Sequence, residues 1–209
     1  MANWMEMATD ERRDLAELLA YLTPEQWRHE SLCEGWTVRD VVAHVVSFEQ
    51  LSWLGVVAAF ARNGIGGGRV NQARLDVYRD HQPRQLVDLL RAHLTPRGLT
   101  AAFGGRIGLT DCLIHHQDIR RPLGIPRAIP RQRLVTALNF SLRSPVLPSK
   151  RNGVGLRLRA TDFDWQHGDG DELSGPAESI LLALAGRTDA LSELEGPGLT
   201  RLQGRVAVA

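Results

Sequence analysis

The sequence has few cysteines and lacks the long apolar runs of a membrane protein. Its 209 residues include only Cys33 and Cys112, too few for a disulfide framework and typical of a reducing compartment. No run of 18 apolar residues is present, so we expect no membrane-spanning helix. No basic and then apolar leader opens the chain. These absences together predict a cytoplasmic protein.

An excess of charge of either sign is also missing. The chain has 25 basic and 24 acidic residues and a formal net charge of +1, so it provides no overall field to attract nucleic acid or an anionic membrane. A hydrophobic content of 43% and a charged content of 23% are those of an ordinary globular protein. We therefore expect a folded protein that binds neither nucleic acid nor membrane, and we take it as a monomer by default.

Apolar residues recur at helical spacing through the first two thirds of the chain. Four substantial helices and a shorter fifth helix are predicted, over residues 3–22, 37–62, 71–94 with an interruption at Pro83, 108–122 and, for the short one, 129–142. Because these helices are joined by modest loops and precede any strand signal, they favour an antiparallel four-helix bundle. We place this bundle at residues 1–145.

The composition changes after the proline-bearing segment 144–148. Residues 155–160 alternate as a half-exposed strand, and residues 162–167 are a candidate hairpin partner. A short helix is predicted from Pro176 to Ala185, and a final strand over residues 199–208. The pattern predicts a mainly α protein in which a small α+β domain, residues 150–209, follows the bundle.

The spacing Asp111-x-x-x-His115 is the most informative chemical pattern. Residues four apart lie one above the other on a helix, so this carboxylate and imidazole point the same way. His44, on a separate predicted helix, is a candidate third ligand. Two imidazoles and one carboxylate would leave open positions on a divalent ion, as catalytic metal sites do. The alternative for His44 is a hydrogen-bonded core histidine.

Two segments resemble the mycothiol-dependent maleylpyruvate isomerase family, a branch of the DinB-like metal-binding four-helix bundles. The segment SLCEGWTVRDVVAHVVSFE is similar to its N-terminal signature, in which a tryptophan follows a loop glycine and a histidine stands eight residues on, here Trp36 and His44. Residues 111–124 are similar to its second motif, which ends in a Leu-Gly pair. The run GLRLRATDFDW and then LSGPAESILLALAGR resembles the small C-terminal α/β domain of many members.

This resemblance implies that His44, Asp111 and His115 bind a divalent ion, usually zinc in the family. It also implies a thiol cofactor, mycothiol or a similar one, and a small electrophilic substrate. Thiol addition, bond rotation and elimination would give isomerisation, whereas addition or displacement alone would give thiol transfer. Asp111 stands where the family usually has glutamate, so this shorter side chain must come closer, bind through water or change the metal preference.

Two further polar residues of this segment have open roles. Asp118 follows His115 by three residues and either holds the imidazole from the second coordination shell or forms a salt bridge with Arg121. His116 is turned by about 100° from His115 around the helix, so it cannot share the direction of His115. We expect His116 to be a surface or interhelical hydrogen-bonding residue.

The remaining candidates have weaker patterns behind them. Trp36 is expected to anchor the core rather than to border the pocket. Both cysteines are expected to be inert thiols, because Cys33 has no recognisable base and Cys112 lies one residue off the direction of the metal ligands. Arg74 and Arg79 are candidates to hold a substrate carboxylate. The sequence identifies no catalytic residue.

A second hypothesis is a DinB-like binding or stress-response module with a structural or vestigial metal site and no catalysis. The aspartate at position 111 keeps this hypothesis open beside the enzyme.

Overall fold

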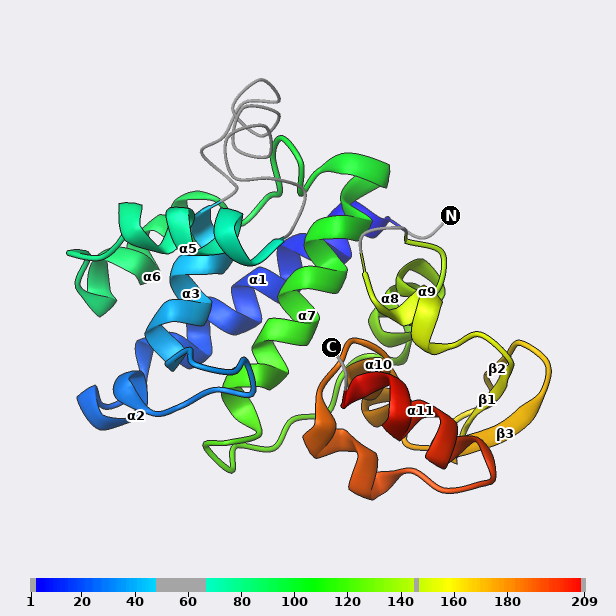
Figure 1. Cartoon of the computed structure of the whole chain (residues 1–209). Coiled ribbons are helices and arrows are strands. Elements are labelled where there is room, and N and C mark those ends of the chain that lie inside the picture. The colour runs from blue at the N-terminus through cyan, green and yellow to red at the C-terminus, as the bar shows by residue number, and fades with distance from the viewer. Residues whose placement is uncertain (1–2, 48–66, 145–146, 208–209) are drawn as a thin grey trace. The chain divides into compact units, whose positions relative to one another are not determined.

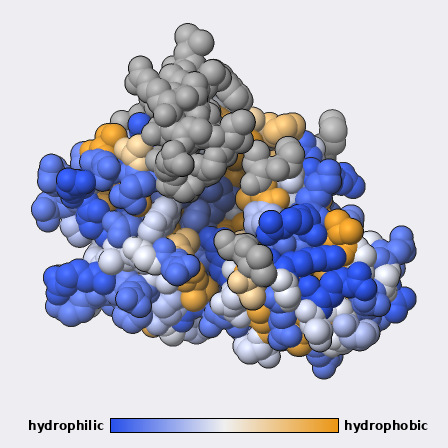
Figure 2. Space-filling model, viewed as in Figure 1, coloured by the Kyte–Doolittle hydropathy of each residue, from blue (hydrophilic) through white to orange (hydrophobic). Residues whose placement is uncertain are grey.

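The computed structural model describes residues 3–47, 67–144 and 147–207 (Figure 1). The chain forms two compact units, Met1–Arg127 and Ala128–Ala209. On the face in Figure 2 most described side chains are hydrophilic, and apolar residues form scattered patches. In the described part of the chain, no helix is both long and apolar enough to cross a bilayer.

The first unit is built around a bundle of four helices, with other helices beside it. Its elements are α1 (Trp4–Ala20), α2 (Pro24–Arg28), α3 (Val38–Ser47), α5 (Gly67–Val77), α6 (Pro83–Ala92), a 3-10 turn (Ala102–Gly105) and α7 (Arg106–Arg120). Helix α1 packs against α6 and α7, and α3 packs against α5, α6 and α7 (Figure 1). The bundle therefore consists of α1, α3, α6 and α7, as the sequence predicts.

Side-chain hydrogen bonds to backbone amides cap the starts of α2 and α3. The side chains of Thr23 and Gln26 form a reciprocal capping box at α2. At α3, the hydroxyl of Thr37 accepts a bond from the amide of Asp40, whose carboxylate accepts in return from the amide of Thr37. The start of α3 at residue 38 is thereby set one residue after the predicted N-cap.

A glycine brings the starts of α1 and α7 together. Gly105 precedes α7 with a φ of 91°, in the left-handed region that favours glycine. A Cβ atom at this position would lie 3.0 Å from the Cα of Met5. Only a residue without a side chain allows this approach, which aligns α7 along α1.

Two helix predictions in this unit differ from the structure. The predicted helix 71–94 is two helices, α5 and α6, separated by the turn at residues 78–82. Proline has no amide hydrogen and starts a helix well, so Pro83 opens α6 rather than interrupting one long helix. The predicted helix 37–62 begins as expected, and its part beyond Ser47 lies outside the described residues.

The second unit contains a three-stranded sheet covered by helices. Its elements are α8 (Arg131–Ser141), α9 (Ser149–Asn152), β1 (Leu156–Ala160), β2 (Gln166–His167), β3 (Asp171–Gly175), α10 (Ala177–Leu184), a 3-10 turn (Thr188–Glu193) and α11 (Gly198–Val206). Strand β1 is central, antiparallel to β2 with Leu158 opposite His167 and parallel to β3 with Leu158 opposite Leu173. Helix α10 contacts both β1 and β3.

Two expectations for this unit differ from the structure. The predicted strand 199–208 is wrong, because this segment is helix α11, which buries Leu202 and Val206, four residues apart. The sequence places the domain boundary at residues 145–150, whereas the compact units divide after Arg127. Helix α8 belongs to the second unit, since it packs against α10.

Candidate metal centre

The three predicted ligands come from two neighbouring helices. Helix α3 buries a run of valines, and His44 lies among them with 8% of its surface exposed. Helix α7 presents Asp111 and His115 one turn apart, and His115 is 9% exposed. Since α3 packs against α7, all three side chains lie at one helix interface.

Their ligand atoms converge. Nε2 of His44 lies 3.7 Å from Oδ1 of Asp111, and Nε2 of His115 lies 3.6 Å from the same oxygen. The two imidazole centroids are 4.8 Å apart, with their planes at 71°. One ligand atom from each of the three residues fits within 4.8 Å of the others. The structure thus brings together the set that the sequence predicts.

This donor set fits a divalent ion such as zinc. Donors bound at about 2.1 Å around one tetrahedral ion lie about 3.4 Å apart, a few tenths of an ångström less than the two nitrogen-to-oxygen distances here. Two imidazoles and one carboxylate leave part of the coordination sphere to other ligands. The shorter side chain of Asp111 still reaches both histidines.

The electrostatics of the cluster favour charge on its members. Burial by itself raises the pKa of Asp111, but the charge of His115 and a hydrogen bond from His44 outweigh burial and lower this pKa to about 2. Burial likewise disfavours the imidazolium of His115, yet Asp111 and the hydrogen bond to Asp118 raise its pKa to about 10. Without a metal, the anionic carboxylates therefore keep a proton on His115, and an ion bound by this imidazole would have to displace that proton.

The carboxylate of Asp118 contacts the His115 ring on the side opposite Asp111. Asp118 is fully buried, and its Oδ2 accepts a hydrogen bond from Nδ1 of His115 at 2.8 Å. This hydrogen bond matches one of the two roles that the sequence leaves open, the orientation of the His115 imidazole by Asp118. It directs Nε2 of His115 towards Asp111.

Cys33 adjoins this pair, a contact that the sequence does not predict. Its Sγ lies 3.1 Å from Oδ2 of Asp118 and 3.8 Å from Nδ1 of His115. The amide of Leu32, the preceding residue, donates to the carbonyl of Asp118 at 3.1 Å. The expectation that Cys33 has no base nearby is wrong, because residues 85 positions apart give no sequence signal of their contact. Cys33, His115 and Asp118 form a second group that could hold an ion.

Trp36 both anchors the core and borders the site. Its ring packs against the hydrophobic cluster of the bundle, and its centroid lies 5.3 Å from that of His44. Half-buried, it covers one side of this imidazole.

His116 points away from the candidate centre, as predicted. It is fully buried, and its Nδ1 lies 2.9 Å from Oε1 of Glu11 on α1 while its Nε2 accepts from Nε of Arg120 at 2.8 Å. Burial lowers the pKa of His116 to about 4 in spite of the hydrogen bond to Glu11. A neutral imidazole that accepts from Arg120 carries its hydrogen on Nδ1 and can donate it to Glu11, and Nη1 of Arg127 also lies against this Nδ1. His116 is the interhelical hydrogen-bonding residue.

The other candidates have structural partners. Burial raises the pKa of the Cys112 thiol, which suits an inert side chain. Nη2 of Arg74 donates to the carbonyl of Ser47 at the end of α3, at 2.7 Å. Nη2 of Arg79 pairs with Asp76 at 2.7 Å on the surface.

The helical bundle and its cluster of two histidines and one carboxylate define a candidate metalloprotein. Residues 8–103 match the model of the mycothiol maleylpyruvate isomerase N-terminal domain, which confirms the resemblance seen in the sequence. The matched segment includes His44 and ends before Asp111. No curated protein sequence matches the chain.

Two solved structures share the fold over nearly their whole length. A crystal structure of a histidine-to-alanine mutant of the mycothiol-dependent maleylpyruvate isomerase is 16% identical, with a TM-score of 0.63, over 94% of this chain and 96% of that chain. A second crystal structure of the mycothiol-dependent maleylpyruvate isomerase is 14% identical, with a TM-score of 0.56 and the same coverage. The small second unit is thus part of the shared architecture.

Proposed function

We propose that this protein is a metal-dependent enzyme that uses a low-molecular-weight thiol, mycothiol or a similar one, to isomerise a small electrophilic substrate or to transfer the thiol to it. The observation that carries the proposal is the convergence of Nε2 of His44, Nε2 of His115 and Oδ1 of Asp111. The family match of residues 8–103 supports the choice of thiol.

In this proposal His44, Asp111 and His115 hold a divalent ion, zinc being the best fit to the donors. When bound, the ion would stabilise the thiolate form of the cofactor and so provide a nucleophile at neutral pH. Two neutral imidazoles and one carboxylate leave a net charge of +1 on a divalent centre, which favours an anionic sulfur as a further ligand. An additional carboxylate ligand would remove that advantage.

The surrounding residues keep the donors in place. Asp118 fixes the tautomer of His115 by accepting from its Nδ1, so that Nε2 is the nitrogen that faces Asp111. Trp36 lies against His44 and shields one side of its ring from water. A ligand set with so little freedom retains its geometry when the cofactor binds.

Metal analysis of the protein without a histidine tag tests the proposal. We expect about one ion per chain in the wild type and a loss of metal in His44→Ala and in His115→Ala, with His167→Ala as the control because it lies on the surface of the second unit. A thiol-dependent isomerisation and transfer assay on the same samples should lose activity together with the metal.

The same measurement addresses the non-catalytic alternative. The aspartate in place of the family's usual glutamate, with a third of its side chain exposed, is the observation that favours a binding module. Stoichiometric metal in a protein that neither binds nor uses a thiol would support that module and would contradict the enzyme.

A further inference from the structure

A cavity of about 580 Å³ lies in the first unit, among α2, the start of α3 and the turn between α5 and α6. Its size is that of a small-molecule site. Four arginines and one histidine line it: Arg28, Arg39, Arg79, Arg84 and His81. No aspartate or glutamate is among its lining residues, but three of the four arginines pair with carboxylates beside the cavity.

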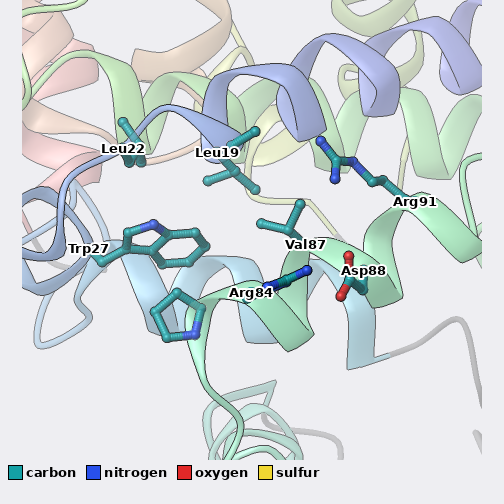
Figure 3. A pocket seen from close by; sticks show the side chains of 9 residues that line it. Leu19, Leu22, Trp27, Arg84, Val87, Asp88 and Arg91 are labelled. Carbon is teal, nitrogen blue, oxygen red and sulfur yellow. The ribbon is translucent and has the colours of Figure 1, made fainter.

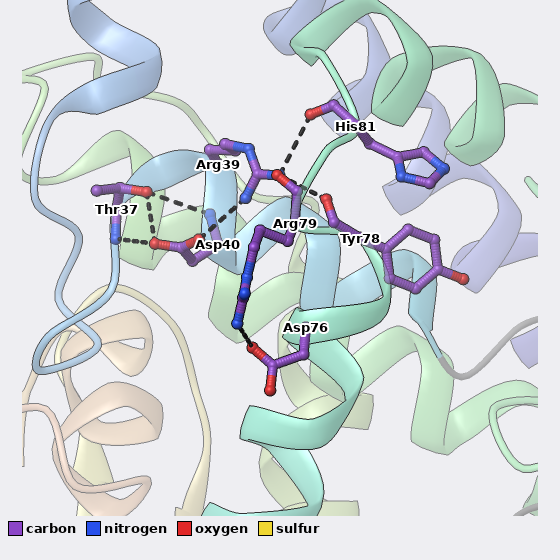
Figure 4. A network of polar contacts seen from close by, with 7 residues as sticks. All are labelled: Thr37, Arg39, Asp40, Asp76, Tyr78, Arg79 and His81. Atoms are coloured by element: carbon purple, nitrogen blue, oxygen red, sulfur yellow. Dashed lines mark hydrogen bonds and ion pairs between the residues drawn. The ribbon is translucent and has the colours of Figure 1, made fainter.

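The basic wall is held in place by backbone groups. The guanidinium of Arg39 donates to the carbonyls of Tyr78 and His81 in the turn after α5 (Figure 4). The same arginine also pairs with Asp40 at 3.3 Å. Arg39 therefore fixes the turn that carries Arg79 and His81 beside the cavity.

Two of the arginines have donors to offer a ligand. Arg79 uses one nitrogen for Asp76, whereas a guanidinium has five N–H donors. Among the residues that the structure describes, Arg84 has no ion-pair partner. It stands in the first turn of α6, where the positive end of the helix dipole adds to its charge.

A second cavity, of about 380 Å³, adjoins the first. The two share the lining residues Leu22, Trp27, Pro83 and Arg84, and the second adds the apolar Leu19 and Val87 and the charged Asp88 and Arg91 (Figure 3). Trp27 is only 5% exposed and belongs to the bundle core. Its indole is thus a rigid wall shared by the two cavities.

We propose that these adjoining cavities bind a small organic anion, with its carboxylate or phosphate group beside Arg79 and Arg84 and its apolar part against Trp27. The apolar side chains of Leu22, Trp27 and Pro83 beside these arginines fit an amphiphilic anion better than a free inorganic ion. None of the three candidate metal ligands lines either cavity. The site is therefore additional to the metal centre and does not depend on the function proposed for that centre.

Titration calorimetry on the full-length protein tests this site with four probes. These are 2-naphthoate, 2-naphthyl phosphate, the neutral 2-naphthylmethanol and inorganic phosphate. We expect one saturable site for at least one of the two aromatic anions, weakened by salt, and much weaker binding of the other two probes. Comparison of the carboxylate with the phosphate ester identifies the preferred anionic group.

Matched variants locate the binding. The double variant Arg79→Ala/Arg84→Ala should lower the affinity for the aromatic anion about tenfold or more, because two charge-assisted contacts are lost. The double variant Arg13→Ala/Arg201→Ala removes the same charge from exposed ion pairs elsewhere and should bind as the wild type does. His44→Ala should also bind normally.

Three results would overturn the proposal. The first is the absence of saturable binding of either aromatic anion to the wild type. The second is an equal affinity in the two arginine double variants. The third is a loss of binding in His44→Ala, which would place the probe at the metal centre instead.

Discussion

Asp118 accepts a hydrogen bond from Nδ1 of His115 at 2.8 Å and thereby turns the opposite nitrogen of the ring towards Asp111. This relationship leads to a direct test of the candidate centre. Asp118→Asn should lower the affinity for zinc about 10- to 100-fold, because an amide neither carries the charge nor fixes the tautomer of the imidazole. Competition with a chromogenic chelator measures the affinity. Asp164→Asn, on the surface of the second unit, is the control, and an unchanged affinity in Asp118→Asn would argue against the arrangement.

The contact of Cys33 with Asp118 predicts different effects for two substitutions. Cys33→Ser keeps a hydrogen-bond donor and should retain the metal affinity of the wild type. Cys33→Ala removes the donor and should lower the affinity for the metal about three- to fivefold, which is the effect expected from the loss of one hydrogen bond.

Cobalt substitution distinguishes this supporting role from direct ligation by Cys33. In the proposed centre the sulfur is not a ligand, so the cobalt protein should lack the near-ultraviolet band of a thiolate-to-cobalt transition. A strong band that disappears in Cys33→Ser would assign the ion to Cys33, His115 and Asp118, the second group that the structure brings together.

The buried ion pair of Glu11 and Arg127 predicts a large effect on stability. Arg127 donates to both carboxylate oxygens, at 2.7 and 2.8 Å, and the Glu11 side chain is fully buried. Glu11→Gln should lower the free energy of unfolding by about 3–5 kcal/mol, because it leaves a buried guanidinium uncompensated. Urea denaturation measures this loss. Glu25→Gln removes a carboxylate from an exposed pair with Arg28 and should change little.

His116 predicts a fall in stability on mild acidification. Its pKa is about 4 in the folded chain, below its ordinary value of 6.5, so the unfolded chain binds the proton more readily. This contribution is complete above pH 6.5 and is lost as the pH falls towards 4, by on the order of 1–3 kcal/mol.

Denaturation series between pH 7 and pH 4, with a chelator present to remove the effect of metal, measure this fall. The uncharged variant His116→Asn should show a shallower decline across that window. An identical slope in both proteins would mean that His116 does not titrate there.

The sequence predicts what depends on local pattern. Thr37 and Asp40 predict the start of α3, and the four-residue spacing of Asp111 and His115 predicts that they share a face. The third ligand, His44, could be proposed because a family pattern surrounds it. Its approach to within 3.7 Å of Asp111 is a property of the packed bundle.

The features that the sequence does not predict depend on tertiary contacts or on apolar residues whose spacing fits both a strand and a helix. Cys33 meets Asp118 only because the loop before α3 lies against the end of α7. Residues 199–208 include a short alternation that suggests a strand, yet the wider spacing of Leu202 and Val206 matches a helix. The sequence correctly predicts a break in the helical pattern at Pro83. That this proline starts a new helix depends on the turn before it.

The ion pair between Arg127 and Glu11 of α1 also determines where the chain can be truncated. A fragment that stops at the end of α7, near Arg121, would omit the counter-charge of a carboxylate sealed inside the bundle. We therefore expect an N-terminal fragment to need the chain through Arg127, seven residues past the end of α7, and truncation within those seven residues should yield an insoluble product.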